Sequence, residues 1–192
     1  MTSRTDFLMW NSSRNTPGIH TYRNTLYITP FNFDNLLLIS DGDLLTGLHF
    51  IGSQKTEELM REGEKSDLPI FRETQRWLDS YFSGRQPDFT PHYKLENVTP
   101  FRQEVSDIMC TIPFGQTMTY GEIAMQIARR HGMRRMSAQA VGGAVGWNPI
   151  CLIIPCHRVM GTKGQLTGYG GGINNKIALL ELEGIDFQRD VT

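Results

Sequence analysis

The first half of the chain alternates short apolar runs with turn signals, a pattern typical of β-strands. Residues 26–31 are expected to be extended, and the apolar runs 36–40 and 44–50 flank the pair Asp41 and Gly42. An Asp-Gly pair between two apolar runs predicts a β-hairpin, because both turn residues must tolerate positive φ.

Helical spacing follows these strands. Apolar positions three and four residues apart predict a helix over residues 69–82, after a charged segment at 54–65 that we expect to be a loop. Its inward face would carry Ile70, Thr74, Trp77, Leu78 and Tyr81. Pro69 suits the first turn of this helix and Gly84 its end. Strands followed by a helix indicate a small α+β unit, and the proline-rich segment 85–98 is the expected linker.

The second half is expected to be mainly helical. Thr99 can cap a helix that begins at Pro100, and Thr119 with Glu122 has the pattern of a capping box for a second helix. Ser137 can cap a third, short helix of sequence AQAVGGAVG at residues 138–146. Two helices joined by a short turn favour a helix-turn-helix, with plain helical packing as the alternative.

The third helix carries almost no side-chain bulk. Each of its glycines costs a helix roughly 1 kcal/mol relative to alanine, so something must compensate. Close packing against another element is one explanation, and close approach to a ligand such as a DNA groove is the other.

Composition is that of an ordinary globular protein, with 39% hydrophobic and 20% charged residues among 192. Apolar runs stay well below the roughly 18 residues of a membrane helix, and no segment has the pattern of a signal peptide. We therefore expect a cytoplasmic protein, or a nuclear one in a eukaryotic cell. The three cysteines, Cys110, Cys151 and Cys156, have the spacing of neither a disulfide framework nor a zinc site.

Charge is unevenly distributed, although the net charge is only −1. The 58 residues between Glu122 and Glu181 contain no Asp or Glu and seven basic residues, whereas the remaining 134 residues have a net charge of −8. The seven are Arg129, Arg130, Arg134, Arg135, Arg158, Lys163 and Lys176. A local basic field is typical of a polyanion-binding surface, and chance segregation on a solvated face is the alternative.

A cysteine beside a histidine, Cys156 and His157, lies in this basic region after the apolar run 150–154, which we expect to be a buried extended segment. Positive neighbours lower the pKa of a thiol, and the thiolate is the nucleophile, so Cys156 is a candidate activated cysteine. A buried structural cysteine is the alternative. Adjacent side chains of an extended chain point to opposite faces, so contact between the two would need a turn or a bridging water.

Four motifs together resemble one family. Asn148-Pro149, the block Ile-Pro-Cys-His-Arg-Val at 154–159, Gly-Tyr-Gly-Gly-Gly at 168–172 and Leu-Leu-Glu-Leu-Glu-Gly at 179–184 are similar to the O6-alkylguanine-DNA alkyltransferases, also called methylated-DNA–protein-cysteine methyltransferases. The resemblance is strong over residues 99–184 and weaker before them.

The resemblance implies an α+β fold in two domains. Residues 1–95 would form a small ribonuclease-H-like α/β domain that contains the antiparallel hairpin and has a structural role. Residues 96–192 would form a mainly helical domain with the helix-turn-helix, for DNA binding and alkyl transfer.

The same resemblance implies roles for single residues. Cys156 would accept the alkyl group. His157 would deprotonate the thiol of Cys156 through a water, and Glu183 would orient the histidine. Asn148 would be a hinge between the helix-turn-helix and the active-site loop. Tyr120 would donate a proton to the departing base.

A flipped base would enter a pocket next to the thiol. The expected substrate-binding residues are Val159, Tyr169, Gly170, Cys151 and Arg158, and the expected DNA-binding residues are Arg134, Arg135, Ser137, Gln139, Ala140 and Gly143. Many family members have an arginine at the position of Gln139, where a long cation fills the gap left by the flipped nucleotide. Family members with an N-terminal zinc site bind the metal there through cysteine and histidine, and because the first half of this chain has no cysteine, no metal is expected.

The function implied is repair of double-stranded DNA by direct, stoichiometric alkyl transfer. A monomer would transfer the alkyl group of O6-alkylguanine, with O4-alkylthymine as a further candidate substrate, to a cysteine without any cofactor. The thioether product is not hydrolysed, so each molecule would act once. Two other classes stay open: a protein that recognises and flips lesions without transfer, and a cysteine hydrolase that turns over small esters.

Overall fold

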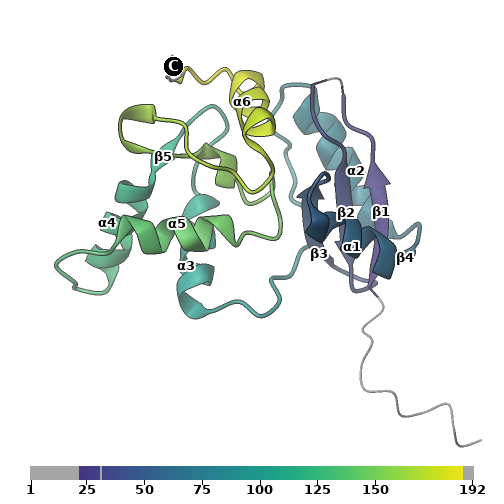
Figure 1. Cartoon of the computed structure of the whole chain (residues 1–192), viewed down its shortest axis with the longest axis horizontal. Coiled ribbons are helices and arrows are strands. Elements are labelled where there is room, and N and C mark those ends of the chain that lie inside the picture. The colour runs from purple at the N-terminus through teal and green to yellow at the C-terminus, as the bar shows by residue number, and fades with distance from the viewer. Residues whose placement is uncertain (1–21, 31, 188–192) are drawn as a thin grey trace, which may run out of the picture.

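The computed structural model describes residues 22–30 and 32–187 (Figure 1). A four-stranded sheet in the order β3-β2-β1-β4 forms the first half. Strands β1 (Arg23–Tyr27), β2 (Leu36–Ser40) and β3 (Leu45–Phe50) pair antiparallel, and β4 (Glu64–Lys65) pairs parallel to β1. All five residues of β2 are buried, which suits the apolar run of its first four residues, Leu36–Ile39.

The predicted hairpin is confirmed. Gly42 has φ +118° between β2 and β3, and the Asp41 carboxylate accepts hydrogen bonds from the backbone N–H groups of Asp43 and Leu44. The first strand lies earlier than expected, at Arg23–Tyr27 instead of residues 26–31, and Phe31 lies outside the described residues.

The prediction of a loop at residues 54–65 is wrong. This segment contains the helix α1 (Gln54–Glu62) and then β4. Ser53 caps the helix through a reciprocal pair of hydrogen bonds with Thr56, a threonine in the place of the more usual glutamate or glutamine. The helix-capping signal was therefore present but chemically atypical.

Four predicted helices are confirmed, three of them with the predicted capping side chain. They are α2 (Pro69–Phe82), α3 (Pro100–Met109), α4 (Tyr120–Arg130) and α5 (Ala138–Gly146). Thr99, Thr119 and Ser137 each accept a hydrogen bond from the backbone near the start of their helix. A further helix that the apolar pattern did not indicate, α6 (Ile173–Leu182), follows the glycine-rich segment.

The expectation of an extended segment at residues 150–154 is wrong. Ile150 forms a single parallel bridge to Leu48 of β3, and the chain then turns, with Leu152 at φ +68°. The side chain of Asn148 closes this turn, because its amide accepts from the N–H of Ile150 and donates to the carbonyl of Ile154 at 2.8 Å. Apolar composition correctly indicated burial but not an extended backbone.

A short pair of parallel strands joins the two sides of the helical half. Strand β5 (Met118–Thr119) pairs with β6 (Val159–Met160), which follows the 3-10 turn η1 (Cys156–Arg158), and the turn η2 (Thr162–Gly164) comes next. This pairing brings the start of α4 beside the segment that contains the cysteine.

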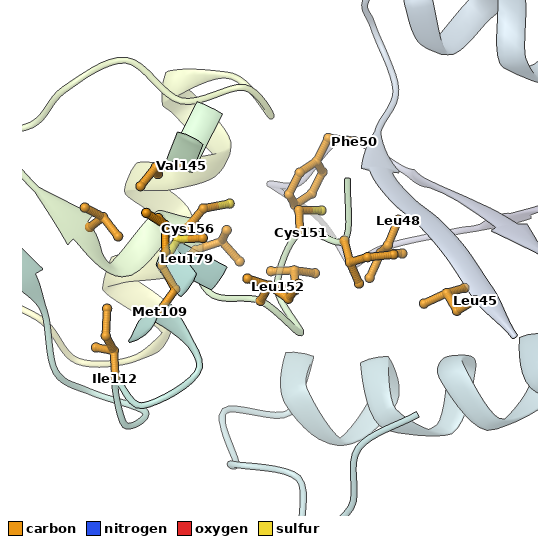
Figure 2. Packing of buried hydrophobic residues seen from close by; sticks show 14 of the residues in the cluster. Leu45, Leu48, Phe50, Met109, Ile112, Val145, Cys151, Leu152, Cys156 and Leu179 are labelled. Carbon is orange, nitrogen blue, oxygen red and sulfur yellow. The ribbon is translucent and has the colours of Figure 1, made fainter. Parts of the chain in front are cut away.

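One hydrophobic cluster extends through both halves of the molecule (Figure 2). Leu48 and Phe50 of the sheet lie beside Cys151 and Leu152, and Cys156 further along the same segment lies near Leu179 of α6. The segment 151–156, which contains the cysteine, is therefore held between the sheet and the helices. None of the helices within the described ranges has the length and apolar composition of a membrane span.

Candidate active site

Cys156 lies at the first position of the turn η1, directly after Pro155, and is 7% exposed. Its Sγ accepts a hydrogen bond of 3.0 Å from the Nδ2 of Asn148, the same amide that closes the preceding turn. Asn148 thus ties the end of α5 to the thiol, which is the position that the family resemblance predicted for a hinge. The turn also provides the bend that contact between Cys156 and His157 would need.

His157 and Glu183 form a fully buried pair in which Nε2 of the imidazole lies 2.7 Å from Oε1 of the carboxylate. A nitrogen that faces a carboxylate carries the proton, so we assign the hydrogen to Nε2 and the lone pair to Nδ1. Nδ1 is buried and has no hydrogen-bond partner among the residues that the structure describes. The imidazole therefore has one nitrogen available to act as a base.

Glu183 accepts several further hydrogen bonds. The guanidinium of Arg158 donates through Nε at 2.9 Å and Nη2 at 3.0 Å, the N–H of Gly115 donates at 3.1 Å, and the hydroxyl of Tyr81 donates at 2.5 Å. Burial alone would raise the pKa of Glu183, but hydrogen bonds and charges of His157 and Arg158 outweigh it and lower this pKa to about 2. The carboxylate is therefore charged near neutral pH.

Burial sets the resting protonation of the reactive pair. It raises the pKa of the Cys156 thiol, against hydrogen bonds from Asn148 and Tyr169 and the charge of Lys176, which lower it. Burial also lowers the pKa of His157, although Glu183 acts in the opposite direction. The site at rest is thus a neutral thiol beside a neutral imidazole, and a thiolate forms when the imidazole takes the proton.

Lys176 is a residue of this site that the sequence analysis missed. It is fully buried on α6, and its Nζ donates to the carbonyl of Val159 at 2.7 Å. Burial lowers its pKa to about 8, while the charge of Cys156 acts to raise it. The only signal in the sequence was its membership of the acid-free basic stretch, which does not reveal burial.

The expected pocket residues divide into two groups. Cys151 and Val159 are buried close to the thiol, and Tyr169 is half-buried there with its hydroxyl inside. Cys151 and Gly170 line a cavity of about 170 Å³ together with Asn148 and residues of the sheet half. Arg158, in contrast, is bound to Glu183 and to the carbonyl of Ile112. Its guanidinium therefore belongs to the buried array of His157, Glu183 and Arg158 and does not face the cavity.

Tyr120 lies at the first position of α4 and is half-buried. Its hydroxyl lies 3.0 Å from the Oγ1 of Thr167, in the segment that leads to Tyr169. The same loop contributes Gly171, where an added Cβ would lie 2.6 Å from the ring of Tyr169 and 2.7 Å from that of Phe50. The ring of Tyr169 is thus fixed by close contact with the glycine-rich segment.

The expected DNA-binding residues lie together on an exposed surface of α5 and the segment before it. They are Arg134, Arg135, Ser137, Gln139, Ala140 and Gly143. A Cβ added at Gly143 would meet no described atom within 4 Å, so packing does not require a glycine there. Of the two explanations for the small residues of this helix, close approach to a ligand is therefore favoured at this position.

Comparison with known proteins agrees with this architecture. The family model described as "6-O-methylguanine DNA methyltransferase, ribonuclease-like domain" matches residues 22–95, and the corresponding "DNA binding domain" model matches residues 100–185. A sheet half followed by a helical half is thus the domain order of a known family. The chain belongs to the 6-O-methylguanine-DNA methyltransferase family.

Individual relatives extend over most of the chain. The methylated-DNA–protein-cysteine methyltransferase of Mycobacterium leprae is 43% identical over 148 residues, which are 77% of this chain and 85% of that protein. The crystal structure of Mycobacterium tuberculosis O6-methylguanine methyltransferase is 42% identical, with a TM-score of 0.69 over 84% of this chain and 91% of that one. A structure of Mycobacterium tuberculosis OGT in complex with DNA is 41% identical, with the same TM-score and coverage.

Proposed function

We propose that this protein repairs DNA by transferring the alkyl group of O6-alkylguanine directly to Cys156. The observation that carries the proposal is the buried array in which Asn148 contacts the thiol and Glu183 orients His157. His157 Nδ1 takes the thiol proton through a water, and the thiolate attacks the alkyl carbon. The S–C bond forms as the O6–C bond breaks, and the electron pair of that bond remains on the guanine.

The leaving guanine needs a proton, and Tyr120 is the proposed donor. Its hydroxyl bonds with Thr167 at the edge of the glycine-rich loop, whose neighbours Tyr169 and Gly170 would contact the flipped base. The O4 of alkylated thymine presents the same kind of leaving group, so O4-alkylthymine is a second proposed substrate. No step requires a cofactor or a metal.

Double-stranded DNA is the proposed partner, bound by α4 and α5 as a helix-turn-helix. The exposed surface that carries Arg134, Arg135 and Gln139 supports this, as does the DNA complex of the relative from Mycobacterium tuberculosis. The small side chains of α5 suit close approach to a minor groove, from which the lesion would be flipped. The proposed protein is a monomer of the cytoplasm, or of the nucleus in a eukaryotic cell.

We also propose that the chain divides into residues 1–95 and 96–192. The helical domain would bind DNA and carry Cys156.

The test is the intact mass of the protein before and after incubation with a duplex that contains O6-methylguanine. Wild type and Cys110→Ser, which changes the exposed cysteine, are expected to gain one methyl group each. Cys156→Ser is expected to gain none while still binding DNA, because groove contacts and not the thiol supply affinity.

A second addition of substrate is expected to transfer nothing further, because a thioether is not hydrolysed. Binding of the lesion with no change of mass in wild type would identify a recognition protein instead. Repeated turnover of a small ester in the absence of DNA would identify a hydrolase.

A further inference from the structure

Tyr81 connects the sheet half of the molecule to the buried array of the helical half. It lies on α2, is completely buried, and its hydroxyl is 2.5 Å from Oε1 of Glu183 and 3.2 Å from Nε2 of His157. These partners are 102 and 76 residues away along the chain. A side chain from the segment that matches the ribonuclease-like domain therefore lies within the site that contains the cysteine.

The direction of both contacts follows from charge. Glu183 is ionised and can only accept, so the hydroxyl of Tyr81 donates to it. Nε2 of His157 already donates its hydrogen to Glu183. The Tyr81 oxygen can therefore only be a second, weaker acceptor of that same hydrogen. The contact with Glu183 is much the shorter of the two, so it dominates.

Aromatic packing holds the hydroxyl in place. The ring of Tyr81 stacks on Trp77 with centroids 5.3 Å apart, and the rings of Phe82 and Phe114 meet it edge-on. Burial first, and then the charge of Glu183, raise the pKa of Tyr81 well above its ordinary value. The phenol therefore remains a protonated donor throughout the pH range in which a histidine titrates.

We propose that Tyr81 is a positioning residue for alkyl transfer, whose hydroxyl restrains Glu183 and so keeps His157 neutral and oriented with Nδ1 free for the thiol proton. The inference rests on the proposed function and adds to it a part for the first half of the chain. That half then contributes an atom to the proton-transfer array and is more than a structural support.

A change in basicity follows from this arrangement. A hydrogen bond donated to a carboxylate withdraws electron density from it, so loss of the Tyr81 hydroxyl makes Glu183 a stronger acceptor for Nε2 of His157. The imidazolium is then better stabilised, and His157 becomes protonated at a higher pH. The other charged or titratable groups that act on this histidine are Arg158 and Lys176, and both disfavour its protonation.

The experiment compares Tyr81→Phe with Tyr27→Phe. The hydroxyl of Tyr27 also donates to a carboxylate, that of Asp79 on α2 at 2.8 Å, so the control removes the same kind of bond away from the thiol. Tyr81→Phe keeps the ring and its packing, and Glu183 retains its donors on Arg158 and Gly115, so the variant is expected to fold.

The measurement is the single-turnover rate of methyl transfer from an O6-methylguanine duplex, between about pH 5 and pH 9. For Tyr81→Phe the acid limb of the profile is expected to move to higher pH by at least about half a unit, a loss of about threefold in rate at a fixed pH on that limb. Tyr27→Phe is expected to follow the wild-type profile.

An acid limb for Tyr81→Phe that coincides with that of wild type, moves to lower pH, or moves no further than that of Tyr27→Phe would overturn the proposal. The pH dependence of Cys156 alkylation by iodoacetamide, located by peptide mass, gives a second reading that needs no DNA. If wild type accepts no methyl group, the proposed function fails, and the iodoacetamide profile still decides the role of Tyr81.

Discussion

Glu183→Gln removes the charge of a buried ion pair while it leaves the shape of the side chain almost unchanged. Arg158 is 8% exposed, and its Nε lies 2.9 Å from Oε2 of Glu183. The chain also has an exposed pair of the same residue types, Arg23 with Glu64, whose side chains are 41% and 56% exposed. Glu64→Gln is therefore a matched control.

The size of the effect can be estimated in two ways. Removal of one partner from a buried ion pair costs about 3–5 kcal/mol, because the other charge stays buried without compensation. Burial raises the pKa of Glu183, and the stronger opposing effect of His157 and Arg158 brings it from 4.5 to about 2, which corresponds to about 3 kcal/mol. For an exposed pair such as that of Glu64 the usual contribution is below about 1 kcal/mol.

The sign of the pH dependence follows from the lowered pKa of Glu183. A carboxylate with a lowered pKa in the folded state stabilises the fold fully above its unfolded pKa and loses this contribution as the pH falls through the folded value. The contribution of Glu183 is therefore complete above about pH 5 and is lost towards pH 2. At about pH 3 roughly half of it remains.

Urea denaturation of wild type, Glu183→Gln and Glu64→Gln at about pH 7 and pH 3 measures these differences. Glu183→Gln is expected to lower the free energy of unfolding by about 3 kcal/mol at pH 7 and by about half as much at pH 3. A loss below about 1 kcal/mol at pH 7, or one that does not shrink in acid, would refute the assignment of Glu183 as the charged centre of the array.

Three further predictions concern the thiol, the DNA surface and the glycine-rich loop. Lys176→Met removes a cation that lowers the pKa of Cys156, so the thiolate fraction falls and iodoacetamide alkylation of that thiol at pH 7 should be several-fold slower than in wild type. Gln139→Arg should make the logarithmic salt slope of DNA binding steeper by about one and speed transfer on duplex but not on single-stranded substrate, both measurable by titration and single-turnover assay. Gly171→Ala would place a Cβ 2.6 Å from the ring of Tyr169, so it should slow transfer and lower the free energy of unfolding by about 1–3 kcal/mol in urea.

Local signals predicted much of the fold because its elements are defined by a few adjacent residues. Asp41 and Gly42 specify the hairpin, and Thr99 and Ser137 cap their helices through bonds within three residues. The failures come where the decisive bond is unusual or longer-range. Helix α1 is capped by Ser53, whose capping partner is Thr56, and the amide of Asn148 bends an apolar run that composition alone would make a strand.

The site was predicted only as far as adjacent motifs and family resemblance extend. Cys156, His157, Glu183 and Asn148 were identified in this way, and the structure brings all four together. Tyr81 was correctly placed on the inward face of its helix, but periodicity treats a buried tyrosine as one more core residue. Its partner is 102 residues away, and only the tertiary fold reveals that contact.

The resting state of Cys156 suits the single reaction that the proposed function assigns to it. Burial raises its pKa, so the thiol is protonated at neutral pH and is a poor target for electrophiles in solution. Proton transfer to His157 forms the thiolate together with an imidazolium beside it, and the cation of Lys176 also favours the thiolate. A flipped base that fills the adjacent cavity would exclude water and strengthen the attraction within that ion pair. Under the proposed function, the acceptor is thus activated mainly when its substrate is bound, which protects a single-use protein from being consumed by other alkylating agents.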